Sequence, residues 1–472
     1  MHAGKLILRK DKLIFHRIGT WYACEHLGCE VKGYMGVKTF FGGIHPKYAK
    51  ELTAASPIEV LQAPETVVVP MVQHIGAPAV PTVKKGDEVL AGQVIGEAPQ
   101  PVSAPVHAPV SGKVAAVTDR PHVNGRSVLS VVIENDGQNR WVSLDPHPDP
   151  VQLSREEIIA RIRAAGIVGM GGAGFPTAVK LTPPKNAVIH VLLINGSECE
   201  PYLTADHRLM LEYAEDLILG AKLLAKACGA KKIIIGVEDN KVDAVAELKK
   251  HAGAIEIVLL DTKYPQGGEK QLIKAVTGRE VPSNGLPFQA GVVVQNVATA
   301  VAVAQAVRDG RPLVERVVTV TGSAVRQPRN FLVPIGTPLQ YLVEAAGGFT
   351  EEPGKVIVGG PMMGLPQYGL EAAVTKTVNG LLALSRAEAV VPEPMPCIKC
   401  ARCVDVCPAY LLPLRLEAFG MHEMWDDAKD YGALDCIECG CCTYICPSKR
   451  PLLQYIRVAK NQIIAASRKQ SS

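Results

Sequence analysis

CIKCARCVDVCP (397–408) and CIECGCCTYICP (436–447) are two copies of one cysteine pattern. Each copy reads Cys-x-x-Cys-x-x-Cys-x-x-x-Cys-Pro, so three cysteines lie on one short loop and a fourth precedes a proline. Three thiolates on one loop can reach three corners of a [4Fe–4S] cube, while the fourth leaves the loop in another direction. The repeat therefore predicts two metal-binding loops that exchange one ligand each.

This spacing is typical of bacterial ferredoxins with two clusters, in which the cysteine before proline binds the cube of the other loop. Pairs of Cys-x-x-Cys also form zinc sites with four cysteines. Zinc is disfavoured because both copies are complete and both end in Cys-Pro. We predict single-electron transfer through two [4Fe–4S] clusters, and the expected ligands are Cys397, Cys400, Cys403, Cys407, Cys436, Cys439, Cys442 and Cys446.

Five of the 13 cysteines lie outside this pattern: Cys24, Cys29, Cys199, Cys228 and Cys441. Cys24 and Cys29 flank His26, but no second ligand pair lies nearby in the sequence, which favours two ordinary thiols over a metal site. Cys441 is next to Cys442, yet only Cys442 keeps the spacing. We expect Cys441 not to be a ligand.

Composition narrows the class of protein. The 472 residues are 47% hydrophobic with a net charge of +4, and no dense block of Lys and Arg suggests nucleic-acid binding. No apolar run approaches the roughly 18–20 residues that cross a bilayer, and the first residues lack the pattern of a secretory signal. Reduced cysteines that serve metal fit a cytosolic protein. We expect a soluble chain that reaches a membrane only through partners.

Shifts in composition predict five segments. Residues 38–145 hold short strand-like runs broken by Gly and Pro, residues 151–312 alternate apolar strands with helical patterns, and residues 313–390 read as a small β-rich domain around one helix. The alternation predicts an α/β domain with a largely parallel sheet, with strands at 188–194, 232–237 and 255–260 and helices near 207–227 and 240–251. The chain is then completed by an N-terminal extension (1–37) and the cysteine-rich domain (391–472), which ends in a basic helix.

Two fragments of the first β segment, VKKGDEVLAGQVIGE (83–97) and SAPVHAPVSGKVAAV (103–117), resemble the halves of a biotinyl/lipoyl-like barrel-sandwich domain. Carrier members of that class bear a lysine between the halves. Residues 91–112 contain no lysine, so we expect a docking or structural role.

A glycine-rich run, GIVGMGGAGFPT (166–177), is the second notable pattern. Glycines allow a ligand to approach the backbone closely, and a helix that follows such a loop favours phosphate. A loop built only for tight turns is the alternative, and the spacing is not that of a Rossmann fingerprint. Polar segments at 195–201, 267–270 and 295–299 follow apolar strands or begin helices, where open α/β sheets bind ligands. Together these segments favour a nucleotide site, although each residue alone could be a helix cap.

GMGGAGFPTAVK, LLINGSECEP, YPQGGEKQLI and VVQNVAT resemble the FMN- and NADH-binding subunit of respiratory complex I. With FFGGIHP near the start, the GGPMMG segment and the double cysteine motif, the chain resembles still more closely the RnfC family of the Rnf ferredoxin:NAD⁺ oxidoreductase complexes. This resemblance implies a complex I-like FMN-binding α/β domain, an N-terminal barrel-sandwich hybrid domain, a β-grasp (SLBB-like) domain and a C-terminal helical domain with two [4Fe–4S] clusters.

The resemblance also implies roles for individual residues. Phosphate and ribityl contacts would come from Gly169, Gly171 and Lys180, flavin contacts from Asn195, Ser197 and Glu198, and the rest of the pocket from Gly268, Glu269, Asn296 and Thr299. Phe175 and Glu200 fall where the complex I relative holds NAD(H). Met170 and Lys270 depart from that relative, where Arg and a second Glu stand, and both positions fall on the dinucleotide side of the implied site.

The implied function is that of a peripheral subunit on the cytoplasmic face of a membrane complex that couples ferredoxin:NAD⁺ oxidoreduction to Na⁺ or H⁺ transport. A flavin links the two-electron chemistry of NAD(H) to the one-electron chemistry of the clusters. The expected partners are the other subunits, NAD(H) and, indirectly, ferredoxin. Two alternatives remain: a flavin and iron–sulfur cobalamin reductase of a bacterial microcompartment, and a flavin-free electron-relay or docking subunit.

Overall fold

The computed structural model describes residues 7–9, 12–17, 20–23, 36–184 and 186–471. The chain divides into two compact units, Met1–Val37 and Lys38–Ser472. In the first unit three antiparallel strands form a small sheet: β1 (Ile7–Arg9), β2 (Lys12–Arg17) and β3 (Thr20–Ala23). The segment with Cys24, His26 and Cys29 lies outside the described residues. No described helix combines the length and apolarity that a bilayer span requires.

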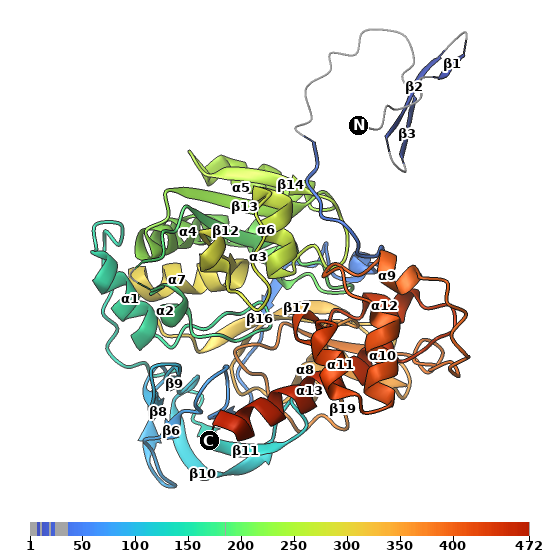
Figure 1. Ribbon diagram of the computed structural model, residues 1–472. Coiled ribbons are helices and arrows are strands. Elements are labelled where there is room, and N and C mark those ends of the chain that lie inside the picture. The colour runs from blue at the N-terminus through green and yellow to red at the C-terminus, as the bar shows by residue number, and fades with distance from the viewer. Residues whose placement is uncertain (1–6, 10–11, 18–19, 24–35, 185, 472) are drawn as a thin grey trace. The chain divides into compact units, whose positions relative to one another are not determined.

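The second unit begins with a barrel-sandwich of two small sheets, drawn in blue to cyan in Figure 1. The two related fragments pair with each other, because Glu88 lies opposite Lys113 and Val94 opposite His107. Val67, Ile95 and Ile133 fill the space between the sheets. The strands are β5 (Thr66–Pro70), β6 (Val80–Pro81), β7 (Glu88–Val89), β8 (Val94–Glu97), β9 (Val106–His107), β10 (Gly112–Pro121) and β11 (Ser127–Asn135).

The α/β domain contains a four-stranded parallel sheet in the order β14-β13-β12-β15. Its first helix, α1, begins with a capping box in which Ser154 and Glu157 exchange side-chain and backbone hydrogen bonds. The strands are β12 (Val191–Gly196), β13 (Lys232–Glu238), β14 (Glu256–Leu260) and β15 (Val292–Asn296), and the helices are α1 (Arg155–Ala164), α2 (Thr177–Lys180), α3 (Ala205–Glu212), α4 (Ala214–Cys228), α5 (Val242–His251), α6 (Glu269–Thr277) and α7 (Val297–Asp309).

One predicted element of this domain is wrong. The single helix expected near 207–227 is two helices, α3 and α4, because Tyr213 leaves the helical conformation with φ −125° and ψ 33°. The change of direction lets α3 reach the carboxyl end of the sheet while α4 packs along α7. The break also places the start of α3 beside the segment 195–201, because the amide of Asp206 donates to Glu198 Oε1.

A mixed six-stranded sheet and one helix form the β-grasp domain, with the strand order β19-β18-β20-β16-β17-β4. β4 comes from a segment before the barrel-sandwich, so the chain enters this sheet twice. Phe331, Leu339 and Leu342 form its core. The elements are β4 (Ile58–Val60), β16 (Glu315–Thr321), β17 (Arg329–Pro334), α8 (Leu339–Ala345), β18 (Lys355–Val358), β19 (Leu365–Gln367) and β20 (Gly380–Leu384).

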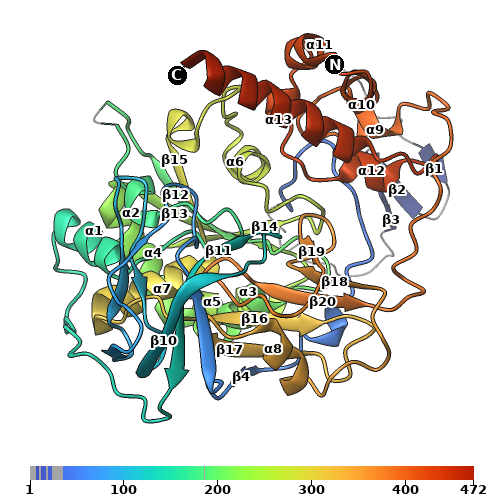
Figure 2. The ribbon, with the colours of Figure 1, turned by 90° about the horizontal axis from the view of Figure 1, so that it is seen from below.

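The cysteine-rich domain is helical, and both ribbon views show its helices gathered together in orange to red (Figures 1 and 2). The long last helix, α13, packs on α10 and α11 through Leu452, Ile456 and Ala459. The helices are α9 (Arg402–Asp405), α10 (Pro413–Met421), α11 (Trp425–Asp430), α12 (Cys441–Ile445) and α13 (Leu452–Ser471).

Candidate cofactor sites

The glycine-rich loop connects α1 to α2 and exposes its tip. The amide of Gly169 donates to the carbonyl of Phe175 (2.9 Å), and the amide of Met170 donates to Thr299 Oγ1 (2.9 Å). Between these anchors Gly171, Gly172 and Ala173 are exposed. Gly172 has φ +111°, and a Cβ there would meet nothing within 4 Å. The loop therefore presents backbone to open space, where a ligand could approach closely.

The helix that follows the loop, α2, has only four residues, so its dipole adds little to phosphate binding. The longer helix α7 begins beside the loop instead. Its N-cap Asn296 accepts hydrogen bonds from the amides of Ala298 and Thr299, and a Cβ at Gly171 would lie 3.2 Å from Asn296 Cβ. The expected support from α2 is thus replaced by packing of the loop against the start of α7.

Predicted residues from three segments meet at the carboxyl edge of the sheet. Asn195 and Asn296 are register partners at the ends of β12 and β15. Asn195 Nδ2 donates to the carbonyl of Gly267 (2.8 Å), next to predicted Gly268, and Asn296 Nδ2 donates to Asp206 Oδ2 (2.6 Å). Because parallel strands end at one edge of the sheet, these residues lie close together although they are far apart in the sequence.

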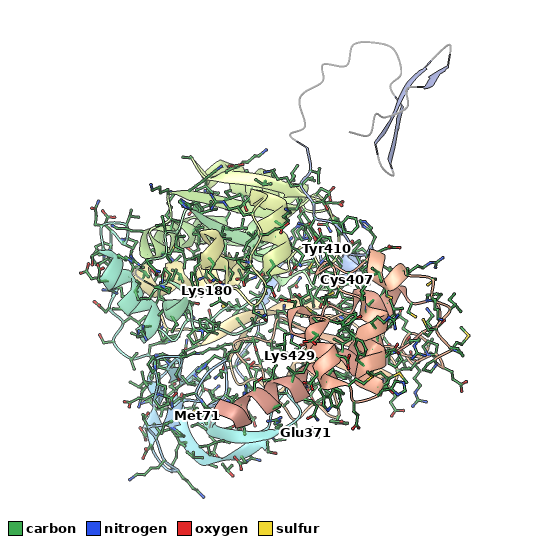
Figure 3. The ribbon with its side chains drawn as sticks, in the orientation of Figure 1. Met71, Lys180, Glu371, Cys407, Tyr410 and Lys429 are labelled. Carbon is green, nitrogen blue, oxygen red and sulfur yellow. The ribbon has the colours of Figure 1, made fainter. Side chains whose placement is uncertain are left out.

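A cation also lies at this edge. Lys180, at the end of α2, forms a 2.6 Å ion pair with Glu269 at the start of α6, and both side chains are part-exposed. Lys180 lies with the α/β domain, while Cys407 and Tyr410 lie with the cysteine-rich domain (Figure 3). Both members of this pair were predicted for the cofactor pocket.

These residues fit a flavin mononucleotide. The exposed glycine backbone and the ammonium of Lys180 suit a phosphate. Ser197 Oγ is buried and has no hydrogen-bond partner among the described residues, so it can serve a polar ligand atom. Gly267 packs closely against this segment, since a Cβ there would lie 3.2 Å from Cys199 Sγ. The polar groups of this site therefore suit the polar edge of a flavin ring and the hydroxyl groups of its ribityl chain.

Two predicted residues are already engaged by backbone amides. Glu198, at φ +47°, accepts from the amides of Asp206 (2.7 Å) and His207 (3.2 Å) and so caps α3. Glu200 accepts from the amides of Met362 (3.1 Å) and Met363 (2.8 Å) in the GGPMMG segment. The Glu198 carboxylate thus binds the N-terminus of helix α3, and the Glu200 carboxylate binds a turn. Phe175, half-buried in the loop, is the remaining predicted NAD(H) contact.

Burial changes the protonation of two carboxyl groups at this site. Burial raises the pKa of Glu200 to about 7, although the two amides and Lys50 act in the opposite sense. Burial, followed by the nearby charge of Glu198, raises the pKa of Asp206 to about 7. Both groups therefore titrate near neutral pH rather than below 5.

Glu200→Gln should change how stability depends on pH. In the folded wild type the proton on Glu200 is held more tightly than at the ordinary pKa of 4.5, so its contribution to stability is present below about pH 4.5 and is lost as pH rises to about 7. The neutral Gln variant does not lose stability in this way. Its free energy of unfolding should therefore rise relative to wild type between pH 4.5 and 7, by about 3 kcal/mol at most. Urea unfolding at a series of pH values measures the difference. Exposed Glu351→Gln is the control, and equal pH trends in all three proteins would contradict the assignment.

Two buried lysines that hold the segment 197–203 were missed from the sequence. Lys50 Nζ donates to the carbonyls of Glu198 (2.8 Å), Glu200 (3.0 Å) and Leu203 (2.6 Å). Lys241 Nζ donates to the carbonyl of Ser197 (2.6 Å) and to Glu238 Oε2 (3.0 Å). No local pattern marks either lysine, because the partners of Lys50 lie about 150 residues away in the chain.

The cysteines form two mixed groups, each with three members from one motif and one from the other. Cys446 lines a cavity together with Cys397, Cys400 and Cys403. In the second group, burial raises the pKa of Cys442 to about 12, and the next causes are the thiolate charges of Cys439, Cys436 and Cys407. Cys407 thus lies with the second motif and Cys446 with the first. This is the arrangement that crossed ligation of two cubes requires.

The thiols of the first group line a cavity and do not converge on a single atom position. Within the part of the chain that the structure describes, no three His, Cys, Asp or Glu side chains converge closely enough to hold a single ion. A zinc site needs its ligands at about 2.3 Å from one centre. Eight thiols in two groups of four are the ligand set that two [4Fe–4S] cubes require.

The second cysteine group adjoins the nucleotide side of the molecule. Tyr264 Oη donates to the carbonyl of Cys439 (2.8 Å), and Gln271 Nε2 donates to the carbonyl of Pro408 (3.2 Å). Cys199 packs in the same apolar cluster as Tyr264, Cys439 and Cys441. Cys441 Sγ lies 3.8 Å from the carbonyl of Tyr264, so this thiol faces the α/β domain. One buried cluster thus joins the edge of the predicted flavin site to the second cysteine loop.

Four family models match the chain in order. They are described as RnfC Barrel sandwich hybrid domain (residues 38–138), Nuo51 FMN-binding domain (162–305), SLBB domain (317–366) and 4Fe-4S dicluster domain (396–449). The predicted fold class is confirmed by these matches and by the described elements.

Three relatives, all of the RnfC type, align along most of the chain. The one from the Na(+)-translocating ferredoxin:NAD(+) oxidoreductase complex of Acetobacterium woodii is 51% identical over 92% of this chain and 100% of its own length. Its proton-translocating counterpart from Clostridium ljungdahlii is 46% identical over 92% and 96%, and the one from the ion-translocating oxidoreductase complex of Rhodobacter capsulatus is 46% identical over 89% and 82%. Among solved structures, an NAD+-reducing [NiFe]-hydrogenase aligns over 69% of this chain and 63% of its own with 22% identity and a TM-score of 0.48.

Proposed function

Because this chain belongs to the RnfC family, whose members are subunits of the ion-translocating ferredoxin:NAD(+) oxidoreductase complexes, we propose that it is the electron-transfer subunit of such a complex. It exchanges hydride between NAD(H) and FMN, and single electrons between FMN and two [4Fe–4S] clusters. The observation that carries the proposal is the buried contact of Cys199 and Tyr264 with the second cysteine loop, which brings the two sites together.

Bound FMN would supply the conversion between paired and single electrons. The chain's own residues place it. Lys180 neutralises phosphate, while Asn195 and Ser197 offer polar groups at the end of β12. Lys50 and Lys241 hold the segment that carries Ser197 and Glu198, because their ammonium groups bind four of its carbonyls.

The clusters would be held by crossed sets of cysteines. Cys397, Cys400, Cys403 and Cys446 hold the first, and Cys436, Cys439, Cys442 and Cys407 hold the second. Cys397 and Cys400 are exposed, whereas Cys407, Cys439 and Cys442 are buried, and Cys439 packs in one apolar cluster with Cys199 and Tyr264 of the α/β domain. The second cluster is therefore the one that faces the flavin.

NAD(H) would approach the exposed tip of the glycine-rich loop, beside Phe175. Glu200 supports this region indirectly, since its carboxylate fastens the GGPMMG segment of the β-grasp domain. Attachment to the cytoplasmic face of a membrane would come from the other subunits of the complex, which also carry the ion transport and the contact with ferredoxin.

Anaerobic purification with analysis of iron, sulfide and flavin tests the proposal. We expect about eight irons and one releasable FMN per chain, and bleaching of both chromophores by NADH. Clusters without flavin would instead support the electron-relay alternative. Rapid reduction of added cobalamin with no transfer to ferredoxin partners would support the cobalamin reductase.

Lys180→Met should weaken FMN binding about tenfold, because one charge-assisted contact with phosphate is lost. Quenching of flavin fluorescence on titration into flavin-free protein measures the dissociation constant. Lys249→Met, on exposed helix α5, is the matched control. Equal affinities in both variants would remove Lys180 from the phosphate site.

A further inference from the structure

Lys376 is a buried cation at the base of the glycine-rich loop. Its side chain is 1% exposed, and its Nζ donates to the carbonyls of Pro105 and Gly166, both at 2.8 Å. Its acceptors among the described residues are these two carbonyls, and no carboxylate is among them. Burial lowers the pKa of Lys376 to about 7, which shows how costly the position is for an ammonium.

The backbone of Lys376 is fastened as well. Its amide donates to Gln73 Oε1 (3.0 Å), and its carbonyl accepts from Arg316 Nη1 (2.5 Å). Gln73 and Pro105 belong to the barrel-sandwich, whereas Lys376 precedes β20 of the β-grasp domain. Lys376 therefore connects the β-grasp domain to the barrel-sandwich, and its ammonium group also binds Gly166, the first residue of the glycine-rich loop.

The other end of the loop is held by the same two domains. The amide of Ile75 in the barrel-sandwich donates to the carbonyl of Gly174 (3.0 Å). A Cβ at Gly174, which has φ +64°, would lie 2.8 Å from Thr377 Cγ2. A Cβ at Gly166, with φ +65°, would lie 2.4 Å from the carbonyl oxygen of Pro105. Both ends are thus glycines pressed against neighbours that a side chain would displace.

The exposed tip, Gly171–Ala173, lies between these two fixed ends. Thr299 holds the middle of the loop through the amide of Met170. The barrel-sandwich strands β8 and β9 are drawn below α2 in Figure 1. A loop fixed at three points can hold its exposed amides in place before a ligand arrives, which lowers the entropy cost of binding.

We infer that Lys376 is a positioning residue for the glycine-rich loop, and that the barrel-sandwich domain, which lacks a carrier lysine, is a fixed support for this loop. The inference rests on the proposed function in one respect, namely that the loop binds FMN. The α/β domain alone cannot fix the two ends of the loop, because the contacts to Gly166 and Gly174 come from the barrel-sandwich and the β-grasp domain.

Lys376→Met tests the inference in the full chain with its clusters. Methionine keeps most of the length of the side chain but donates no hydrogen bond, so the carbonyls of Gly166 and Pro105 lose their donor. Removing a buried charge offsets part of the lost stability, so the fold should persist. We expect FMN to bind about 10- to 100-fold more weakly, the effect of one charge-assisted hydrogen bond. The iron content should stay unchanged, and Lys113→Met on exposed strand β10 is the control.

A second readout does not depend on flavin. Without FMN, amide hydrogen exchange at Gly169 and Gly174 should be faster in Lys376→Met than in wild type, while exchange in β12 and β13 stays the same. If wild type itself binds no FMN, the proposed function fails, and hydrogen exchange still tests the support of the loop. Flavin affinity within twofold of wild type together with unchanged exchange would overturn the inference. Should Lys376→Met not fold, Lys376→Leu, which likewise donates no hydrogen bond, is judged by the same two measurements.

Discussion

Cys446→Ala should remove one cluster, and the lost cluster should be the one held by the first cysteine motif. Cys446 belongs to the second motif in sequence, but it lines the same cavity as Cys397, Cys400 and Cys403. A cube that keeps three thiolates is far more labile than one with four. The iron content should fall from about eight to about four per chain, with a matching loss of sulfide.

Double variants identify the lost cluster by counting iron. Cys446→Ala combined with Cys400→Ala removes two ligands of one cube and should leave about four irons. Cys446→Ala combined with Cys439→Ala damages both cubes and should leave almost none. Cys407→Ala should show the reverse pattern, because Cys407 lies with Cys436, Cys439 and Cys442.

Cys441→Ala is the control for this series, since Cys441 faces the carbonyl of Tyr264 and should leave both clusters intact. If Cys446→Ala and Cys439→Ala together lost no more iron than either alone, the two cysteines would share a cube. Crossed ligation would then be wrong.

Local patterns made much of this molecule predictable. Ligand spacing in the cysteine motifs and the capping box at Ser154 each depend on residues a few positions apart, so the sequence displays them directly. The alternation of strands and helices likewise predicted the parallel sheet. The break at Tyr213 had no such signal, because neither Gly nor Pro stands near it.

The interior of the candidate site was not predictable in the same way. Lys50, Lys241 and Lys376 are buried, whereas lysine is almost always exposed. The acceptors of Lys376 lie more than 200 residues away in the chain, so only the fold brings them together. Glu198 and Glu200 were expected at the cofactors through resemblance, yet their carboxylates accept from backbone amides. Resemblance pointed to the segment but could not give the direction of each side chain.

Lys241→Met should lower the free energy of unfolding by about 3–5 kcal/mol, because it leaves a buried carboxylate without its partner. Lys241 and Glu238 are 1% and 0% exposed, with Nζ and Oε2 3.0 Å apart. Burial already raises the pKa of Glu238, and the charge of Lys241 opposes that rise. Without the lysine the carboxyl group should take up a proton more readily, so the deficit should grow as the pH rises above the ordinary range of a glutamate. Lys250→Met breaks an exposed ion pair on α5 and should cost less than about 1 kcal/mol.

A double variant separates stability from the site. In Lys241→Met/Glu238→Leu both charges are gone, so most of the lost stability should return. The carbonyl of Ser197 still lacks its donor, which was 2.6 Å away. Flavin affinity should therefore remain low in a protein whose urea unfolding is close to wild type. Full recovery of both properties would show that Lys241 serves only the fold, and that the segment 197–203 keeps its conformation through Lys50 alone.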